Sequence, residues 1–204
     1  MKKNLGAIPA IFPMPVLMIA TYDNEGNIDV MNAAWGMMED MKKVALNLTA
    51  THKTVKNIKE KGAFTVAIAD ANNVVAADYV GMVSGNSEKN KFAKSGLHAK
   101  KSEFVDAPVI DEFLVTMECK FLEYQDGENG CGVIGEIVNV VADEKVLDSN
   151  GKIDSSKINA ILYDPFKTCL QRPFRCCRAA GQKQHRGRGR GGAGTSCKGK
   201  AFCQ

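Results

Sequence analysis

Residues 113–142 read FLVTMECKFLEYQDGENGCGVIGEIVNVVA, and this stretch decides the fold class. Two apolar segments, Phe113 to Tyr124 and Val133 to Ala142, flank the turn-forming residues QDGENG at 125–130. Both segments are rich in β-branched and aromatic residues, which favour strands, and an Asp-Gly pair between two such runs is typical of a hairpin turn. The stretch therefore predicts a long antiparallel hairpin.

The same stretch contains a motif that could be mistaken for a nucleotide site. Gly130 to Gly135 match the spacing GxGxxG. That fingerprint requires a strand before it and a helix after it, because the pyrophosphate binds to the amides of a helix N-terminus. Here a turn precedes the glycines and the strand-like EIVNVV follows them. We therefore interpret the motif as part of the hairpin and expect no Rossmann fold.

The chain before this hairpin also favours strands. Leu17 to Tyr22 and Ile28 to Ala34 flank the turn cluster DNEGN, which predicts another hairpin. Alternating apolar residues at 44, 46 and 48 indicate a half-buried strand, and Ala63 to Ala69 favour a further one.

Short helices are expected between these strands. Thr51 to Lys61 should form a helix that Thr51 caps and Gly62 ends. The apolar spacing over Asn72 to Val83 predicts a second helix, and Ser84 to Gly96 should form a loop with one helical turn. Strands that follow one another with few crossover helices indicate a mainly β protein, an antiparallel barrel with short α-helices attached.

Composition divides the chain into two unlike parts. The 204 residues suit one domain, and no apolar run is long enough to span a membrane. The net charge of +4 is the sum of two unlike parts. The body at 1–167 has 18 basic and 23 acidic residues, whereas the tail at 168–204 has nine basic and no acidic residues. We expect no secretory signal and a cytoplasmic location for the protein. The two scattered cysteines of the body, Cys119 and Cys131, suit a reducing compartment.

The tail at 168–204 is atypical because it combines cysteine, arginine and glycine without acidic residues. We hypothesise that it is a disordered segment or the product of a reading-frame error. Its three Arg-Gly steps lack interleaved aromatic residues, so nucleic-acid binding is not expected. Its cysteines lack the Cys-x-x-Cys spacing of structural zinc sites.

The body offers few residues for acid–base or nucleophilic catalysis. Its histidines are His52 and His98, and neither a Gly-x-Ser-x-Gly elbow nor a His-rich run occurs. We therefore assign no catalytic residue and no metal ligand, and we expect the chemistry to come from a cofactor.

Two polar clusters could hold a phosphate. One joins the end of a predicted strand to a helix start, where free amides and the helix dipole attract anions. The alternative is that the first cluster is an ordinary capped helix start and the second a solvated loop. The first cluster comprises Thr49, Thr51, Lys53 and Thr54, and the second comprises Ser84, Ser87, Lys89 and Lys91.

The order of several short motifs gives a resemblance. Along the chain they are FPMPV (12–16), NAAW (32–35), THKTVKNI (51–58), SG (84–85), KF (91–92), GL (96–97), IGEI (134–137) and ILYDP (161–165). With this ordered set, residues 1–167 resemble the flavin reductase-like, FMN-binding split-barrel family, in its flavoredoxin branch. The resemblance implies an antiparallel split β-barrel of Greek-key type that binds FMN noncovalently and forms a homodimer through barrel faces.

The resemblance also implies a cofactor site. The segment closing the second strand would contact the isoalloxazine ring, and the two polar clusters would contact the ribityl chain and phosphate. Trp35 could instead be a core residue, whereas the Asn32 amide could pair with the edge of the ring. The implied cofactor-binding residues are Asn32, Ala33, Ala34, Trp35, Thr49, Ala50, Thr51, Lys53, Thr54, Ser84, Lys89 and Lys91.

The function implied is an FMN-dependent oxidoreductase that passes electrons from NAD(P)H, or from an electron-transfer protein, through bound FMN. An electron carrier or flavin-binding module without turnover of its own is the alternative, and the sequence does not separate the two. A relative of the pyridoxamine-phosphate oxidases is less favoured, because the body lacks an Arg-rich substrate loop.

Overall fold

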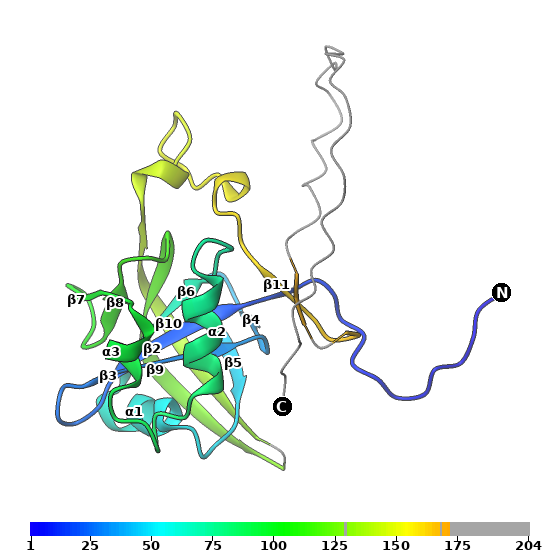
Figure 1. Cartoon of the computed structure of the whole chain (residues 1–204), viewed down its shortest axis with the longest axis horizontal. Coiled ribbons are helices and arrows are strands. Elements are labelled where there is room, and N and C mark those ends of the chain that lie inside the picture. The colour runs from blue at the N-terminus through cyan, green and yellow to red at the C-terminus, as the bar shows by residue number, and fades with distance from the viewer. Residues whose placement is uncertain (129, 168, 172–204) are drawn as a thin grey trace.

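The computed structural model of the chain describes residues 1–128, 130–167 and 169–171. Its centre is one antiparallel sheet that curls into a half-barrel (Figure 1). The strands of this sheet are β2 (Leu17–Tyr22), β3 (Ile28–Ala33), β4 (Gly36–Met38), β5 (Lys43–Leu48), β6 (Ala63–Ile68), β9 (Val115–Gly127) and β10 (Gly130–Ala142). Their spatial order is β3-β2-β6-β9-β10-β5-β4, so β3 and β4 form the two edges.

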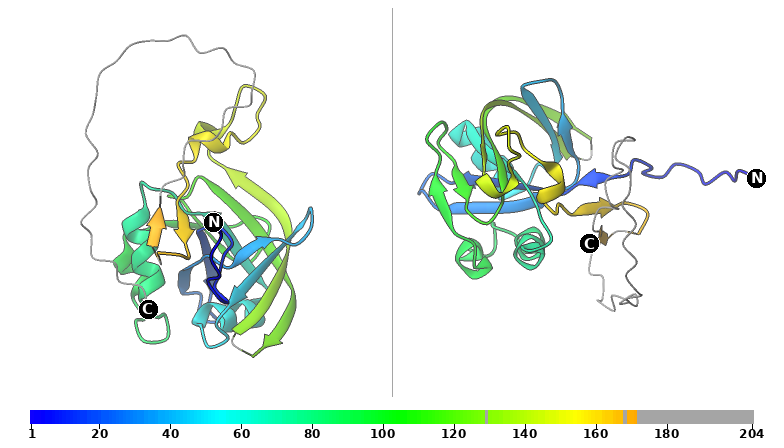
Figure 2. Two further views of the ribbon diagram at one scale, coloured as in Figure 1. Left: turned by 90° about the vertical axis from the view of Figure 1, so that its right-hand side faces the viewer. Right: turned by 90° about the horizontal axis from the view of Figure 1, so that it is seen from above.

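The remaining elements surround this sheet. The helices are α1 (Lys53–Lys61), α2 (Val74–Met82) and α3 (Lys91–Ser95), and the short 3-10 turns are η1 (Glu144–Val146) and η2 (Ser155–Lys157). The smaller sheets combine β1 (Met14–Pro15), β11 (Leu162–Asp164) and β12 (Cys169–Gln171), and β7 (Ala99–Lys101) with β8 (Pro108–Ile110). Strand β11 lies between β1 and β12, beside the N-terminal segment (Figure 2).

The long hairpin β9–β10 curves around one side of the barrel (Figures 1 and 2). Its register shifts twice, between Ile134 and Gly135 and between Ile137 and Asn139. Such irregularities bend a strand and increase its twist, which helps a sheet to curl. A Cβ at Gly135 would collide with the ring of Phe64, so only glycine lets this buried ring pack against β10.

Strand β2 is buried on both faces, which explains its continuous apolar sequence. Leu17 and Ile19 point into a core inside the curled sheet, together with Phe64 and residues of β5 and α1. Met18 and Ala20 point to the opposite face, into a second core that α2 and the segment around α3 cover. The sheet therefore separates two apolar cores.

Helix α1 ends as the sequence indicates but begins later. Gly62 adopts a left-handed conformation with φ 68° and its amide donates to the Ile58 carbonyl, a standard C-terminal stop. The N-cap is His52 rather than Thr51, and its side chain makes no capping hydrogen bond. The expected Thr51 cap is therefore wrong.

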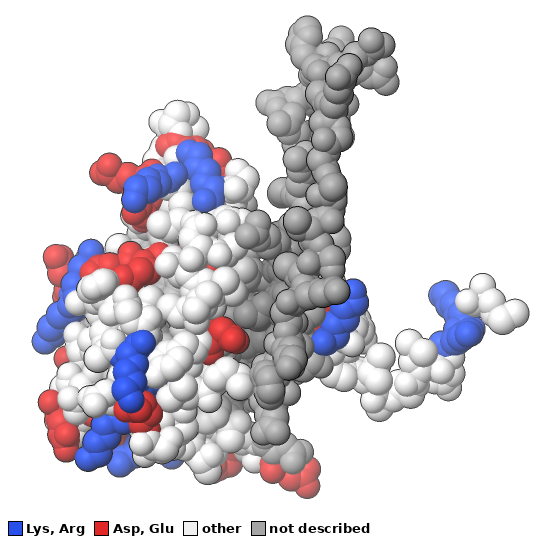
Figure 3. All heavy atoms as spheres, viewed as in Figure 1, with Lys and Arg blue, Asp and Glu red and all other residues white. Residues whose placement is uncertain are grey.

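The mainly β fold class, the antiparallel split barrel and the β9–β10 hairpin are confirmed. Residues 130–135 lie in β10, as the hairpin interpretation requires. Of the predicted tail, residues 169–171 form β12, and residues 168 and 172–204 lie outside the described residues. None of the helices in the described part of the chain has the length and apolar character needed to cross a membrane. On the face shown in Figure 3, acidic and basic side chains are interspersed over the body.

Candidate functional site

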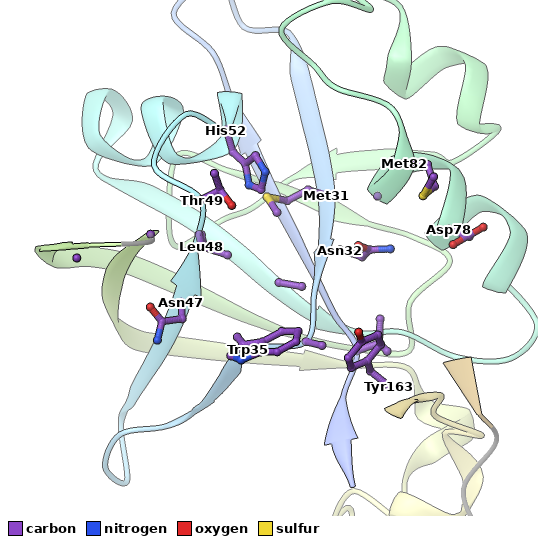
Figure 4. A pocket seen from close by; sticks show the side chains of 16 residues that line it. Met31, Asn32, Trp35, Asn47, Leu48, Thr49, His52, Asp78, Met82 and Tyr163 are labelled. Carbon is purple, nitrogen blue, oxygen red and sulfur yellow. The ribbon is translucent and has the colours of Figure 1, made fainter. Parts of the chain in front are cut away.

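A pocket with a volume of about 770 Å³ opens where the ends of β3 and β5 face helix α2 (Figure 4). This volume falls within the range of about 300–1,000 Å³ that is typical of small-molecule and cofactor sites. The residues lining it are Val16, Met31, Asn32, Ala33, Ala34, Trp35, Asn47, Leu48, Thr49, His52, Asp78, Gly81, Met82, Gly127, Gly130 and Tyr163.

The end of β3 and the residues after it form one wall, lined by Asn32, Ala33, Ala34 and Trp35, whose contact with a flavin ring stays a prediction. The Trp35 carbonyl accepts a hydrogen bond of 2.7 Å from the backbone N–H of Asn47, which ties this wall to β5. The Trp35 ring lies 5.5 Å from that of Tyr163, tilted by 52°. Its side chain is 47% exposed, so the alternative of a core tryptophan is wrong.

Asn32 links this wall to helix α2. Its Nδ2 donates a hydrogen bond of 3.0 Å to the Ala77 carbonyl. A Cβ at Gly81 would collide with the Asn32 amide, so glycine at this position lets α2 approach β3 closely. The Asn32 side chain is thus fixed at the pocket wall, and within the described part of the chain its Oδ1 accepts no hydrogen bond. Its pairing with a flavin ring stays a prediction.

The opposite end of the pocket lies at the start of α1, where Thr49 and His52 line it (Figure 4). No residue of the first turn of α1 is itself acidic, so the turn adds no negative charge of its own to the partial positive charge of the helix N-terminus. Burial lowers the pKa of His52, and the nearby positive charge of Lys91 lowers it further, against an opposing effect of Asp29. The lowered pKa of His52 favours the neutral imidazole at pH 7.

Beneath this end lies a buried network centred on Asp29 of β3. Lys91 Nζ lies 3.2 Å from its Oδ1, and Thr54 Oγ1 donates to its Oδ2 over 2.6 Å. The side chains of Lys91 and Asp29 are 5% and 3% exposed. Lys91 and Thr54, which were predicted to contact the cofactor, thus contact Asp29 and do not line the pocket.

Lys53 behaves similarly. Its Nζ lies 3.0 Å from Asp23 Oδ2. Burial alone would raise the pKa of Asp23, but hydrogen bonds from Lys53 and Asn27 outweigh it and hold that pKa at about 2. The ion pair anchors Lys53 near the α1 N-terminus, outside the pocket lining.

The structure brings the two predicted polar clusters together. The Asn86 side chain donates to the Thr51 carbonyl over 3.0 Å, which joins the loop after α2 to the loop before α1. Ala50, Thr51, Ser84 and Lys89 are exposed there and do not line the pocket. Of the twelve predicted cofactor residues, five line the pocket: Asn32, Ala33, Ala34, Trp35 and Thr49.

Sequence reasoning missed the contributions of several distant segments. These include Met31, Asn47, Leu48, His52, Asp78, Gly81, Met82 and Tyr163. A signal existed for α2, because Asp78, Gly81 and Met82 follow the i, i+3, i+4 spacing that places side chains on one helix face. Tyr163 belongs to the motif ILYDP, but its closeness to Trp35 depends on the pairing of β11 with β1, which the motif does not reveal.

Comparisons with known families place these observations in context. The family model described as flavin reductase like domain matches residues 10–157. Among curated proteins, an uncharacterised protein of Aquifex aeolicus is 24% identical over 163 residues, which cover 74% of this chain and 80% of that protein.

Solved structures agree with this match. The flavoredoxin of Desulfovibrio vulgaris (Miyazaki F) superposes with a TM-score of 0.81 and 34% identity, covering 88% of this chain and 97% of that one. A flavoredoxin from Methanosarcina acetivorans gives a TM-score of 0.80 at 24% identity, covering 88% and 95%. The second likeness concerns the fold alone.

Proposed function

Because the chain belongs to the flavin reductase like domain family, we propose that it is an FMN-dependent oxidoreductase that passes electrons from NAD(P)H, or from a protein donor, through bound FMN. Its likeness to a flavoredoxin at 34% identity supports this function. We propose the cytoplasm as its location, in keeping with the free thiols of Cys119 and Cys131.

The observation that carries the proposal is a pocket with two chemically different ends. One end has small residues and amide side chains at Asn32, Ala33, Ala34 and Asn47, beside the exposed Trp35 ring. The other end has Thr49 and the start of α1. A flat ring joined through a polyol to a phosphate has the same two-ended chemistry, so the residues present fit FMN.

In this assignment the ring would lie against the wall formed by Asn32, Ala33 and Ala34, beside Trp35. The phosphate would lie near Thr49 and the α1 N-terminus, where backbone amides and the helix dipole favour an anion. Lys53 and Lys89 would add positive charge from nearby. FMN itself, when bound, supplies the hydride and single-electron chemistry.

The chain's own part is to bind and orient rather than to transfer protons. Among the lining residues, His52 is neutral at pH 7 and Thr49 offers a hydroxyl donor. Fixed polar groups at the wall, such as the Asn32 amide held by Ala77, orient a ligand without reorganising.

The first test is cofactor preference. Purified protein should bind FMN more tightly than riboflavin, because only FMN carries the phosphate, and fluorescence quenching measures both affinities. The FMN-loaded protein should then oxidise NADH or NADPH in a steady-state absorbance assay. Failure to bind FMN would refute the proposal. If the protein binds FMN but neither oxidises NAD(P)H nor accepts electrons from a protein donor with turnover, a carrier or flavin-binding module without turnover of its own is favoured.

A pair of variants tests the phosphate end. Lys53→Ala removes a positive charge near the α1 N-terminus and leaves Asp23 there without its cation, so it should weaken FMN binding by about fivefold, the effect of one nearby charge in near-aqueous surroundings. Riboflavin binding should hardly change. Lys56→Ala is the matched control. Lys56 lies three residues after Lys53 on the same helix, its side chain is 70% exposed, and its loss should affect the binding of neither ligand. If Lys53→Ala binds FMN as tightly as Lys56→Ala and the unmodified protein do, the phosphate lies elsewhere.

A further inference from the structure

Helix α2 presents a carboxylate to the pocket. Asp78, Gly81 and Met82 share one helix face, and all three line the pocket (Figure 4). Asp78 makes no hydrogen bond or ion pair with any of the residues that the structure describes. An exposed acid on a helix is usually only solvated, but this one lies at the rim of a cavity.

Asp78 also decides the charge of the pocket lining. The sixteen lining residues include no lysine and no arginine, and Asp78 is the one acidic residue among them. His52 adds no positive charge at pH 7, because burial and Lys91 lower its pKa. The nearby lysines Lys53 and Lys91 are paired with Asp23 and Asp29. The ring end of the pocket therefore has a negative local charge.

Two aromatic rings lie across the pocket from α2 (Figure 4). Trp35 and Tyr163 both line it, with ring centroids 5.5 Å apart and planes tilted by 52°. Tilted aromatic rings offer electron-rich faces to cations, and tryptophan is the strongest such partner. Aromatic faces and a carboxylate lining one cavity are complementary to a flat ring that carries a positive charge.

We propose that Trp35, Tyr163 and Asp78 form a subsite that binds flat heteroaromatic cations and discriminates against aromatic anions. As a substrate site, the subsite depends on the proposed function, because it would select the small molecules that exchange electrons with the flavin. Its selectivity is set by the charge of the ligand ring, since Asp78 attracts a cation and repels a carboxylate of the same shape.

Three probes of nearly equal size separate charge from shape. They are 1-methylnicotinamide, which is cationic, nicotinamide, which is neutral, and nicotinate, which is anionic. Titrations at fixed ionic strength use the FMN-loaded full chain, with flavin absorbance as the readout. A second arm uses FMN-free protein and the emission of Trp35, the only tryptophan in the chain. The cation should bind at least about fivefold more tightly than the anion, the effect of one nearby charge in near-aqueous surroundings.

Asp78→Asn keeps the size of the side chain and removes its charge. The preference for the cation should fall by about fivefold, the effect of the one charge removed. FMN affinity is measured in the same variant, so that a change in cofactor loading is separated from a change in selectivity. Asp111→Asn is the matched control at an exposed aspartate outside the pocket, and should leave the preference intact.

Equal binding of cation and anion by the unmodified chain, or a preference that Asp78→Asn leaves unchanged, would overturn the proposed subsite. Loss of FMN binding by the unmodified chain would refute the proposed function instead. The Trp35 emission arm still decides in that case whether the cation subsite exists.

Discussion

Gly81 is a single residue on which the width of the pocket depends. In the interior of a helix, Gly→Ala usually stabilises by about 1 kcal/mol. Here the new methyl group would collide with the Asn32 amide, and overpacking typically costs about 1–3 kcal/mol. We therefore expect Gly81→Ala to reverse the usual sign and lower the free energy of unfolding, which urea denaturation followed by circular dichroism measures.

The same substitution in an Asn32→Ala background supplies the control. Without the amide there is no collision, so Gly81→Ala should be neutral or stabilising in that background. If it destabilises both backgrounds equally, contact with Asn32 is not the reason for glycine at this position.

Single residues also show what sequence could and could not foresee at the site. Asn32 and Trp35 were placed at the cofactor site from their motif, and both line the pocket. That the Asn32 amide is held by the Ala77 carbonyl was not predictable, because the partner lies 45 residues away. Likewise, Lys91 was expected at a phosphate, but its partner Asp29 lies 62 residues earlier and no local pattern pairs them.

At the scale of elements, the strands with a clear apolar pattern were predicted closely. The expected Leu17 to Tyr22 is β2 itself, and the helix expected over 72–83 is α2 at Val74–Met82. Strands β4, β7 and β8 were missed, because each has three residues and too short a pattern to detect. Their strand conformation depends on partners, such as β5 beside β4, rather than on their own sequence.

A buried ion pair between Lys91 and Asp29 links helix α3 to the barrel. Lys91→Met would leave Asp29, which is 3% exposed, without its cation. Removing one partner of a buried pair typically costs about 3–5 kcal/mol, so we expect the free energy of unfolding in urea to fall by that amount. Proteolysis within residues 84–90 should also become faster, since the loop loses one of its anchors and keeps only weaker ones, such as the Asn86–Thr51 hydrogen bond.

Lys94→Met is the matched control on the same helix. Lys94 pairs with Glu88 at the surface, where its side chain is 56% exposed, and such pairs contribute little. Indistinguishable unfolding curves for the two variants would show that burial of Lys91 does not matter to the fold.

For the whole molecule, the exposed apolar residues at the β4 edge favour self-association. Met37, Met38 and Met41 are 71%, 49% and 93% exposed, next to Trp35 at the pocket. Clustered exposed apolar residues often mark interfaces, and two-fold dimers are the commonest assembly. We propose a homodimer, and light scattering should give about twice the 22.1 kDa of one chain.

A charge placed in this edge should dissociate the dimer. Met37→Lys is expected to shift the mass toward one chain at micromolar concentration. Val75→Lys, at an 82% exposed apolar position on α2, should leave the mass unchanged. A single-chain mass for the unmodified protein would exclude the dimer.

The double-sided burial of β2 has a consequence for the smallest piece of this chain that can fold. Met18 and Ala20 face the core beneath α2, while Leu17 and Ile19 face the core inside the curled sheet. A fragment reduced to the seven strands would keep the inner core and expose the outer apolar face to water, a surface prone to aggregation. We therefore expect helices α2 and α3 to be part of the minimal autonomous domain, and internal deletions that remove them should yield an insoluble sheet rather than a simpler barrel.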